Sequence, residues 1–208
     1  MIYRQLMSDK KMCNYFKSNY FPKKKDGFFI EAGAADGYSG SVCFGLEQIG
    51  WTGVNVEANP HFMEALIENR PDSINIHTAL SNKVGTAPLT IPQCKEDFLT
   101  PGGSSLSFWD YREEKGIKSK IYIDVPVTTY YQLCQDHNIT HVDLFVLDVE
   151  GEELRVIEGI EDVDPLPEIF YIEDNKVDSD ELDEAMSSLG YKGERVNQDN
   201  TVYRREDE

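Results

Sequence analysis

An acidic residue and two glycines follow a short apolar segment early in the chain, in the sequence FFIEAGAADG. Glu31, Gly33 and Gly37 form the pattern ExGxxxG, where an expected strand turns into an expected helix. We expect glycine at residue 33 because a side chain there would block a ligand that lies across the end of the strand. We expect glycine at residue 37 because the chain turns there into the helix. The dinucleotide fingerprint GxGxxG would require a glycine at Ala35. This turn is therefore more typical of a site for a nucleoside or an amino-acid tail.

Three further acidic residues end apolar segments. Glu57 follows GVNV, where a carboxylate can accept hydrogen bonds from both hydroxyls of a ribose. Asp148 ends the strand in FVLDVEGEE, and Glu173 ends the next one in EIFYIEDN. Because the carboxyl ends of parallel strands line one crevice, we expect these acids to face the same ligand as Gly33. For the acids after Asp148, a helix N-terminus that attracts negative charge is the alternative explanation.

The elements that position these residues follow from the alternation of short apolar runs with helical patterns, which is typical of βαβ units around a parallel sheet. We predict a Rossmann-like α/β fold with a seven-stranded, mostly parallel sheet, an antiparallel C-terminal hairpin and helices on both faces. The expected strands are residues 28–32, 53–57, 73–80, 142–148, 168–173, 191–196 and 201–204, with an additional strand pair at 88–93 and 121–128.

The predicted domain organisation has two parts. Residues 1–25 form an N-terminal helical extension, and residues 26–208 form one domain without a second core. A polar, glycine-containing loop at 95–120 is too long for a simple connection and is expected to contact substrate or act as a lid.

Composition narrows the class of protein. The 208 residues include 20 Lys and Arg against 38 Asp and Glu, a net charge of −18. Such a chain repels phosphate backbones and anionic lipids, so we expect neither nucleic acid nor a membrane as partner. No apolar run is long enough to span a bilayer, and no signal peptide is visible, so we expect a cytoplasmic protein. The sequence leaves the oligomeric state open, and a homodimer is one option.

Taken together, the motifs resemble the FkbM family of S-adenosylmethionine-dependent methyltransferases, which have the class I methyltransferase fold. The resemblance rests on ExGxxxG, the acid in NVEANP, and FVLDVEGEE followed by a strand that ends in Glu, with TALSN and GGSSL as further similar segments. It covers about residues 26–175. It implies O-methylation of a hydroxyl on a sugar, a glycan or a small natural product.

The resemblance implies a role for each matching residue. Those expected around the cofactor S-adenosylmethionine are Glu31, Gly33, Ala34, Asp36, Gly37, Glu57, Ala79, Leu80, Ser81 and Asp148. The residues at 33, 34, 36 and 37 would surround its methionine part, Glu57 would hold the ribose, and residues 79–81 would border the adenine. Asp148 would lie beside the transferred methyl group.

Deprotonation of an acceptor hydroxyl has two candidate routes. Asp148, Glu150 and Glu173 are candidate catalytic acids and bases, whereas His137 and His141 are expected at the opposite end of the strand. The second route is a metal: Asp148, Asp174 and Asn175 would offer three oxygen ligands of the kind that Mg²⁺ or Ca²⁺ accepts.

The loop offers candidate substrate contacts, namely Ser104, Ser105, Trp109, Tyr111 and Arg112. Its aromatic residues either close over the acceptor or pack the loop onto the fold. Two alternative functions remain at this level: an NAD-dependent oxidoreductase, which also needs an acid after the second strand, and a catalytically silent binding subunit. The nucleophile is not named by the sequence, so N- or C-methylation also stays open.

Overall fold

The computed structural model describes residues 2–95, 98–99, 104–106, 119–160 and 165–205. Its main sheet contains seven strands: β1 (Phe28–Ala32), β2 (Thr52–Glu57), β3 (Ile74–His77), β8 (Leu144–Leu147), β9 (Ile169–Glu173), β10 (Tyr191–Arg195) and β11 (Asn200–Arg205). The helices are α1 (Ile2–Asn19), α2 (Phe44–Glu47), α3 (Met63–Asn69), α4 (Tyr130–Asp136), α5 (Glu153–Glu158) and α6 (Ser179–Ser188).

The strand order of the main sheet is β10-β11-β9-β8-β1-β2-β3. The five strands from β3 to β9 are parallel, β11 is antiparallel to β9, and β10 is antiparallel to β11. From β1 the chain adds β2 and β3 on one side, and later adds β8 and β9 on the other side, so the strand order reverses between β1 and β8. In open α/β sheets, ligands bind at such a point, outside the carboxyl ends of the strands. The predicted α/β fold with its seven-stranded sheet is confirmed.

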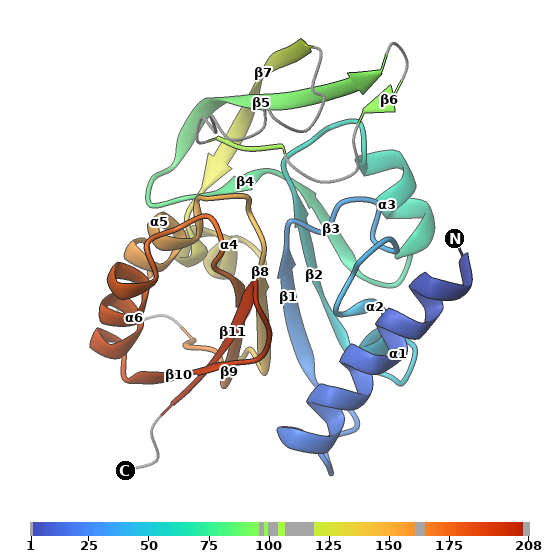
Figure 1. Ribbon diagram of the computed structural model, residues 1–208, viewed down its shortest axis with the longest axis vertical. Coiled ribbons are helices and arrows are strands. Elements are labelled where there is room, and N and C mark those ends of the chain that lie inside the picture. The colour runs from blue at the N-terminus through green and yellow to red at the C-terminus, as the bar shows by residue number, and fades with distance from the viewer. Residues whose placement is uncertain (1, 96–97, 100–103, 107–118, 161–164, 206–208) are drawn as a thin grey trace.

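Helices cover both faces of this sheet, with α1 to α3 on one side and α4 to α6 on the other (Figure 1). The strand residues explain this arrangement, because apolar side chains occupy both faces of β1, where Phe29 and Ile30 are each fully buried. Phe29 belongs to the apolar cluster beneath α1 and α2, and Ile30 belongs to the cluster beneath α4, α5 and α6. Alternating side chains thus build one core layer on each side.

The N-terminal segment packs against the first of these layers. Cys13 and Phe16 of α1 are buried, and the Phe16 ring meets Tyr171 of β9 edge to face at 5.4 Å. After the helix, Lys24 forms ion pairs with Asp143 and with Glu168 at the start of the neighbouring strands. The division into a 1–25 extension and a 26–208 domain stays a prediction. No helix in the described ranges is long and apolar enough to cross a membrane.

A second sheet stands over the carboxyl ends of the main one (Figure 1). Its order is β4 (Ala79–Leu80), β7 (Ser119–Thr128), β5 (Gly85–Lys95) and β6 (Phe98–Leu99). The predicted strand pair is confirmed as β5 and β7, which are antiparallel. The expected strand 73–80 is corrected, because it divides into β3 and β4 and β4 belongs to the second sheet. This sheet has an apolar cluster of its own, which the sequence reading missed.

Candidate active site

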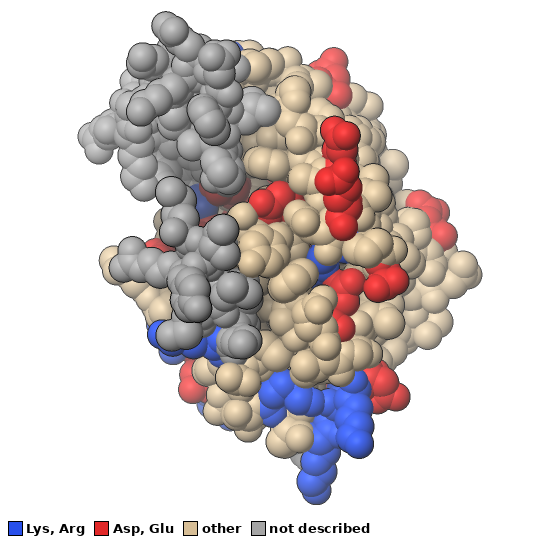
Figure 2. All heavy atoms as spheres, turned by 90° about the vertical axis from the view of Figure 1, so that its right-hand side faces the viewer, with Lys and Arg blue, Asp and Glu red and all other residues tan. Residues whose placement is uncertain are grey.

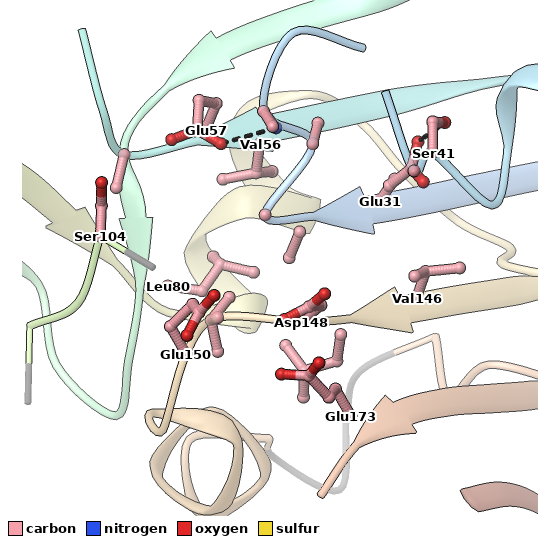
Figure 3. Close-up of a pocket in the computed structure, with 18 of the residues that line it drawn as sticks. Glu31, Ser41, Val56, Glu57, Leu80, Ser104, Val146, Asp148, Glu150 and Glu173 are labelled. Carbon is pink, nitrogen blue, oxygen red and sulfur yellow. Dashed lines mark hydrogen bonds between the residues drawn. The ribbon is translucent and has the colours of Figure 1, made fainter. Parts of the chain in front are cut away.

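A pocket of about 410 Å³ lies between the carboxyl ends of the main sheet and the second sheet. Its size falls in the range typical of small-molecule sites. Figure 3 shows Asp148, Glu150 and Glu173 gathered at one side of it, with Glu57 across from them. Ten of the residues predicted from the sequence line this pocket: Glu31, Gly33, Ala34, Glu57, Ala79, Leu80, Ser104, Asp148, Glu150 and Glu173.

Gly33 adopts a left-handed backbone conformation, with φ of 84°, directly after β1. A Cβ atom on this residue would collide with the backbone carbonyl oxygen of Asp148. The close approach of the chain after β8 therefore requires glycine here, a reason that sequence reasoning missed and that is separate from the predicted room for a ligand. The next turn residue, Ala35, is also left-handed at φ 49°, a conformation that costs free energy in any residue with a side chain.

Glu57 ties this turn to the end of β2. One carboxylate oxygen accepts the N–H of Ala35 at 2.7 Å, and the other accepts the N–H of Asn59 at 2.6 Å. Burial raises the pKa of Glu57, and these backbone hydrogen bonds act in the opposite direction. Each oxygen keeps a second lone pair, so the carboxylate can still accept a bond from a ligand hydroxyl.

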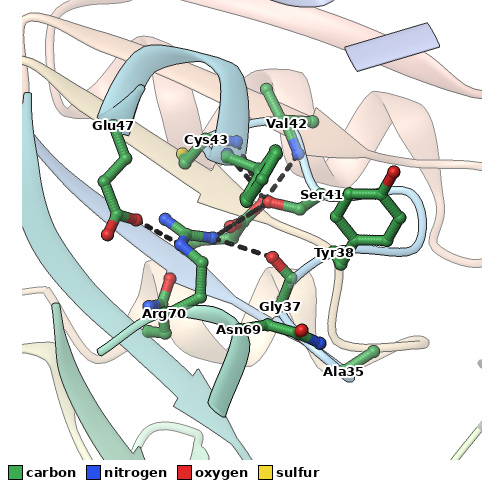
Figure 4. Close-up of polar contacts among 12 residues, drawn as sticks. Ala35, Gly37, Tyr38, Ser41, Val42, Cys43, Glu47, Asn69 and Arg70 are labelled. Carbon is green, nitrogen blue, oxygen red and sulfur yellow. Dashed lines mark hydrogen bonds and ion pairs between the residues drawn. The ribbon is translucent and has the colours of Figure 1, made fainter. Parts of the chain in front are cut away.

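Glu31 lines the pocket, but its carboxylate serves mainly to hold the loop after Gly37. It accepts hydrogen bonds from the Ser41 hydroxyl at 2.7 Å and from the N–H groups of Val42 at 2.7 Å and Cys43 at 3.2 Å. The fully buried Arg70 donates to it at 3.1 Å and also pairs with Glu47 (Figure 4). Sequence reasoning missed this network.

Three residues predicted to touch the cofactor do not line the pocket. Asp36 accepts the N–H groups of the two residues at 38 and 39, and a side chain on Gly37 would meet Leu66 and Arg70. The Ser81 hydroxyl donates to Glu152 at 3.0 Å. These residues shape the loops around the pocket, and their direct contact with a cofactor stays a prediction.

The segment after β8 forms a tight turn that presents two acids. Glu150 is left-handed at φ 60°. Glu153 holds this turn, because its carboxylate accepts the N–H groups of Val149 at 2.9 Å and Gly151 at 2.8 Å. Burial raises the pKa of Glu153 to about 7. The ligand-oxygen atoms of Asp148, Glu150 and Glu173 all lie within 4.8 Å of one another.

Lys176 neutralises part of this negative charge. Its side chain is only 8 % exposed, and its ammonium group pairs with Glu150 at 2.8 Å and with Glu173. Burial lowers the pKa of this lysine, but the two carboxylates outweigh that effect and raise it. Burial, followed by the charge of Glu173, raises the pKa of Asp148 well above its usual range. Sequence reasoning missed Lys176. It was detectable as a lysine three residues after Glu173 in a segment that contains almost no other basic residue.

The predicted metal site is not assembled. Side chains of consecutive strand residues point to opposite faces, so Asp174 turns away from Glu173. Asp174 accepts hydrogen bonds from Arg195 and, at 2.7 Å, from the Thr201 hydroxyl, and it lines a separate hollow beside α6. Asn175 is exposed and does not line the pocket. Of the three expected ligands, the structure therefore brings only Asp148 to the pocket.

The family model of the methyltransferase FkbM domain matches residues 31–192 of this chain. The protein belongs to the FkbM methyltransferase family. It is therefore an S-adenosylmethionine-dependent methyltransferase, and the NAD-dependent oxidoreductase is set aside. No curated protein matches the chain significantly.

Solved methyltransferase structures resemble this FkbM methyltransferase at low sequence identity. The METTL16 MTase domain is 9 % identical with a TM-score of 0.52, over 97 % of this chain and 67 % of that one. A putative RNA methyltransferase, PH1948 from Pyrococcus horikoshii, is 8 % identical with a TM-score of 0.48, over 95 % and 81 %. TrmK from M. capricolum, solved with S-adenosyl-homocysteine, is 8 % identical with a TM-score of 0.47, over 92 % and 65 %.

The predicted substrate residues of the FkbM methyltransferase differ in whether they line the pocket. Ser104 lines the pocket and accepts a hydrogen bond from Asn59 at 3.0 Å. Ser105 does not line it, since its hydroxyl donates to the carbonyl of Glu150 at 2.7 Å. Trp109, Tyr111 and Arg112 lie outside the described residues. Where the predicted 95–120 loop is described, it forms the end of β5, β6, the 104–106 segment against β5, and the start of β7.

Several lining residues of the FkbM methyltransferase were not predicted. Met12 of α1, Tyr171 of β9 and Asn200 of β11 line the pocket, and Asn200 lies opposite Glu173 in the sheet register. Tyr171 was detectable in principle, because it precedes Glu173 by two residues and so shares its face of the strand. His141 lies within 2.7 Å of Asp143 at the start of β8, which agrees with the expectation that it sits at the opposite strand end.

Proposed function

We propose that this pocket binds S-adenosylmethionine across the ends of β1, β2 and β8 and transfers its methyl group to a neutral hydroxyl of a sugar or similar small molecule. The observation that carries the proposal is the meeting of the Gly33 turn, Glu57 and the Asp148 side chain in a single pocket. In this arrangement the methionine part lies at Gly33 and Ala34, and the ribose lies at Glu57.

The side of the pocket formed by the second sheet suits an adenine ring. Ala79, Leu80, Leu89 and Phe62 contribute apolar surface there. A planar base gains stability from apolar contact on its faces, while polar groups fix its orientation. The cofactor would then lie along the sheet edge, with its methionine part near β8 and β1, its ribose at the end of β2 and its adenine against the second sheet.

The opposite side suits the acceptor and the reacting methyl group. The acceptor oxygen attacks the methyl carbon as the carbon–sulfur bond breaks, so S-adenosylhomocysteine leaves and the hydroxyl proton passes to a carboxylate. Glu173 is the candidate proton acceptor, and Tyr171 and Asn200 are candidate acceptor contacts beside it. The negative charge of this cluster also favours the positively charged sulfonium.

Charge favours a neutral acceptor. Six acidic residues line the pocket, namely Glu31, Glu57, Asp148, Glu150, Glu152 and Glu173. Arg70 pairs with Glu31 and Lys176 pairs with Glu150 and Glu173, but no Lys or Arg of the described chain lines the pocket itself, so acids outnumber bases around it. Figure 2 shows that most Lys and Arg on the face with α1 and α3 lie at the end of the molecule away from the second sheet. A phosphorylated or carboxylated acceptor, including RNA, would therefore meet repulsion at the pocket.

Calorimetric titration with S-adenosylhomocysteine tests the cofactor assignment. The native protein should bind, and Glu57→Gln should bind about tenfold or more weakly, because a hydrogen bond to a charged group is lost. Glu68→Gln, at an exposed position of α3, is the control and should bind like the native protein. Absence of binding by the native protein, or an unchanged affinity of Glu57→Gln, would contradict the assignment.

Transfer of a radiolabelled methyl group tests the acceptor class. Supplied with neutral sugars, uronic acids, sugar phosphates and RNA, the protein should label the neutral sugars most strongly. Release of the label by reagents that cleave methyl ethers would identify oxygen as the nucleophile. Preferential labelling of RNA or of sugar phosphates would show that the charge argument is wrong.

A further inference from the structure

Lys176 lies where a divalent cation would be expected among three carboxyl groups. The oxygen atoms of Asp148, Glu150 and Glu173 converge within 4.8 Å, a ligand set that a hard metal ion accepts. The ammonium group of Lys176 contacts two of these residues, at 2.8 Å for Glu150 and by a second ion pair for Glu173. A cation therefore already occupies the cluster, and it belongs to the chain.

The backbone holds this arrangement from separate elements. Glu150 is presented by the left-handed turn after β8, which the Glu153 carboxylate fixes through two backbone N–H groups. Glu173 ends β9, and Lys176 follows it in the short connection to α6. The Lys176 side chain is 8 % exposed and loses most of its hydration, which costs free energy. Ion pairs offset this cost only where the partner carboxylates are held in place. The turn after β8 holds Glu150 in this way.

Asp148 has a different environment from the other two acids. Its carboxyl group is hydrogen-bonded to that of Glu173, and two carboxyl groups in such contact share one proton. The Lys176 ammonium group pairs with Glu173, which leaves Asp148 as the member of this carboxyl pair that carries the proton. Burial of Asp148 acts in the same direction and raises its pKa.

We propose that Lys176 is the resident cation of the methyl-transfer pocket: it takes the place of a divalent metal by pairing with Glu150 and Glu173 where their oxygen atoms converge with those of Asp148. Lys176 is thus a positioning residue that acts through Glu173. The catalytic consequence rests on the proposed function: Glu173, held by Lys176, is the carboxylate that receives the acceptor proton, and transfer needs no added metal. That proton returns to solvent after the methylated product leaves.

Binding of Mn²⁺ alone tests the proposal without any acceptor. Monitored by electron paramagnetic resonance, the native protein should bind no Mn²⁺ in the pocket at pH 7.5. Lys176→Met should bind one ion, at least about tenfold more tightly than the detection limit for the native protein, since three carboxyl groups then converge without a cation. The double variant Lys176→Met/Glu173→Gln should lose this site. Lys192→Met, at an exposed position of β10, should behave like the native protein.

Two outcomes of this experiment would overturn the proposal. One is a tight Mn²⁺ site in the native protein that Glu150→Gln removes. The other is a folded Lys176→Met variant, verified by circular dichroism, that gains no affinity for Mn²⁺.

A second measurement uses the native protein, in case Lys176→Met fails to fold. Carbon-13 NMR of labelled carboxyl groups should show Asp148 protonated at a pH where exposed acids are fully ionised. Lys176→Arg should preserve this state of Asp148. An ionised Asp148 at that pH would contradict the proposal. Titration with S-adenosylhomocysteine is independent of these readouts, so a failure of the proposed function is distinguishable from a failure of this assignment.

Discussion

Gly33 is the residue on which the geometry of the site depends most directly. It lets the chain after β1 pass against the carbonyl oxygen of Asp148, and this brings the first turn and the acid after β8 into the same pocket. A larger residue would have to separate the two segments. The residue therefore acts on the cofactor site through the packing of two neighbouring strand ends.

Gly33→Ala should destabilise the protein by about 3 kcal/mol or more, because a left-handed alanine is strained and its Cβ has no room. Gly190→Ala is the matched control: φ is 83° and no atom lies within 4 Å of the added Cβ. That variant should lose only about 1 kcal/mol, the cost of the backbone conformation. Urea unfolding measures both. Equal losses would mean that the contact with Asp148 is unimportant.

Between elements, Arg70 connects α3 to β1 and to the loop that begins at Gly37. It is fully buried, pairs with Glu31 and Glu47, and lies over the Phe29 ring at 5.2 Å. The loop it holds contributes Ser39 and Gly40 to the pocket wall. A guanidinium in the core thus controls a segment of the site that it does not itself line.

Arg70→Met should lower the free energy of unfolding by about 3 to 5 kcal/mol, since it leaves Glu31 and Glu47 without their buried partner. It should also weaken binding of S-adenosylhomocysteine. Arg155→Met provides the comparison, because Arg155 pairs with Glu152 while 59 % exposed. An exposed pair contributes about 1 kcal/mol at most. Chemical denaturation and calorimetry measure the two effects, and a small loss for Arg70→Met would contradict this role.

At the scale of the whole molecule, the chain carries a net charge of −18, and some of its acids are buried near the pocket. These buried acids make stability depend on pH. Burial raises the pKa values of Glu57, Asp148 and Glu153, the last to about 7. The folded state then binds protons more tightly than the unfolded state, so the free energy of unfolding falls as pH rises through this range. The ion pair of Lys24 lowers the pKa of Asp143 against the effect of burial, which affects stability only at pH below about 4.

We therefore expect the native protein to be less stable at pH 7.5 than at pH 5.5, with Glu153 contributing about 2 kcal/mol to the difference. Glu153→Gln should remove that contribution, although it also loses one backbone hydrogen bond at both pH values. Urea unfolding at the two pH values measures the change, and the exposed Glu158→Gln serves as control. An identical pH dependence of Glu153→Gln and the native protein would show that Glu153 is not the group responsible.

Much of this architecture was predictable because its signals are local. The apolar strands before Gly33, Glu57 and Asp148 and the helices between them appear in the sequence as short periodic runs, and they lie within a residue or a few of their observed bounds. The carboxyl ends of parallel strands share one edge, so the meeting of these residues followed from the fold class. The second sheet was less visible, because β4 is two residues long and pairs with β7 far along the chain.

What the sequence alone determined is therefore the family, the fold class and the strand ends that form the site. The tertiary structure decided what each side chain does there. It turned Asp174 to the opposite face, used Glu31 to anchor a loop, and placed Lys176 between Glu150 and Glu173. Such assignments depend on which face of the sheet meets the pocket and which distant partner approaches within hydrogen-bond distance. Local spacing fixes only which neighbouring strand residues share a face, so it encodes neither.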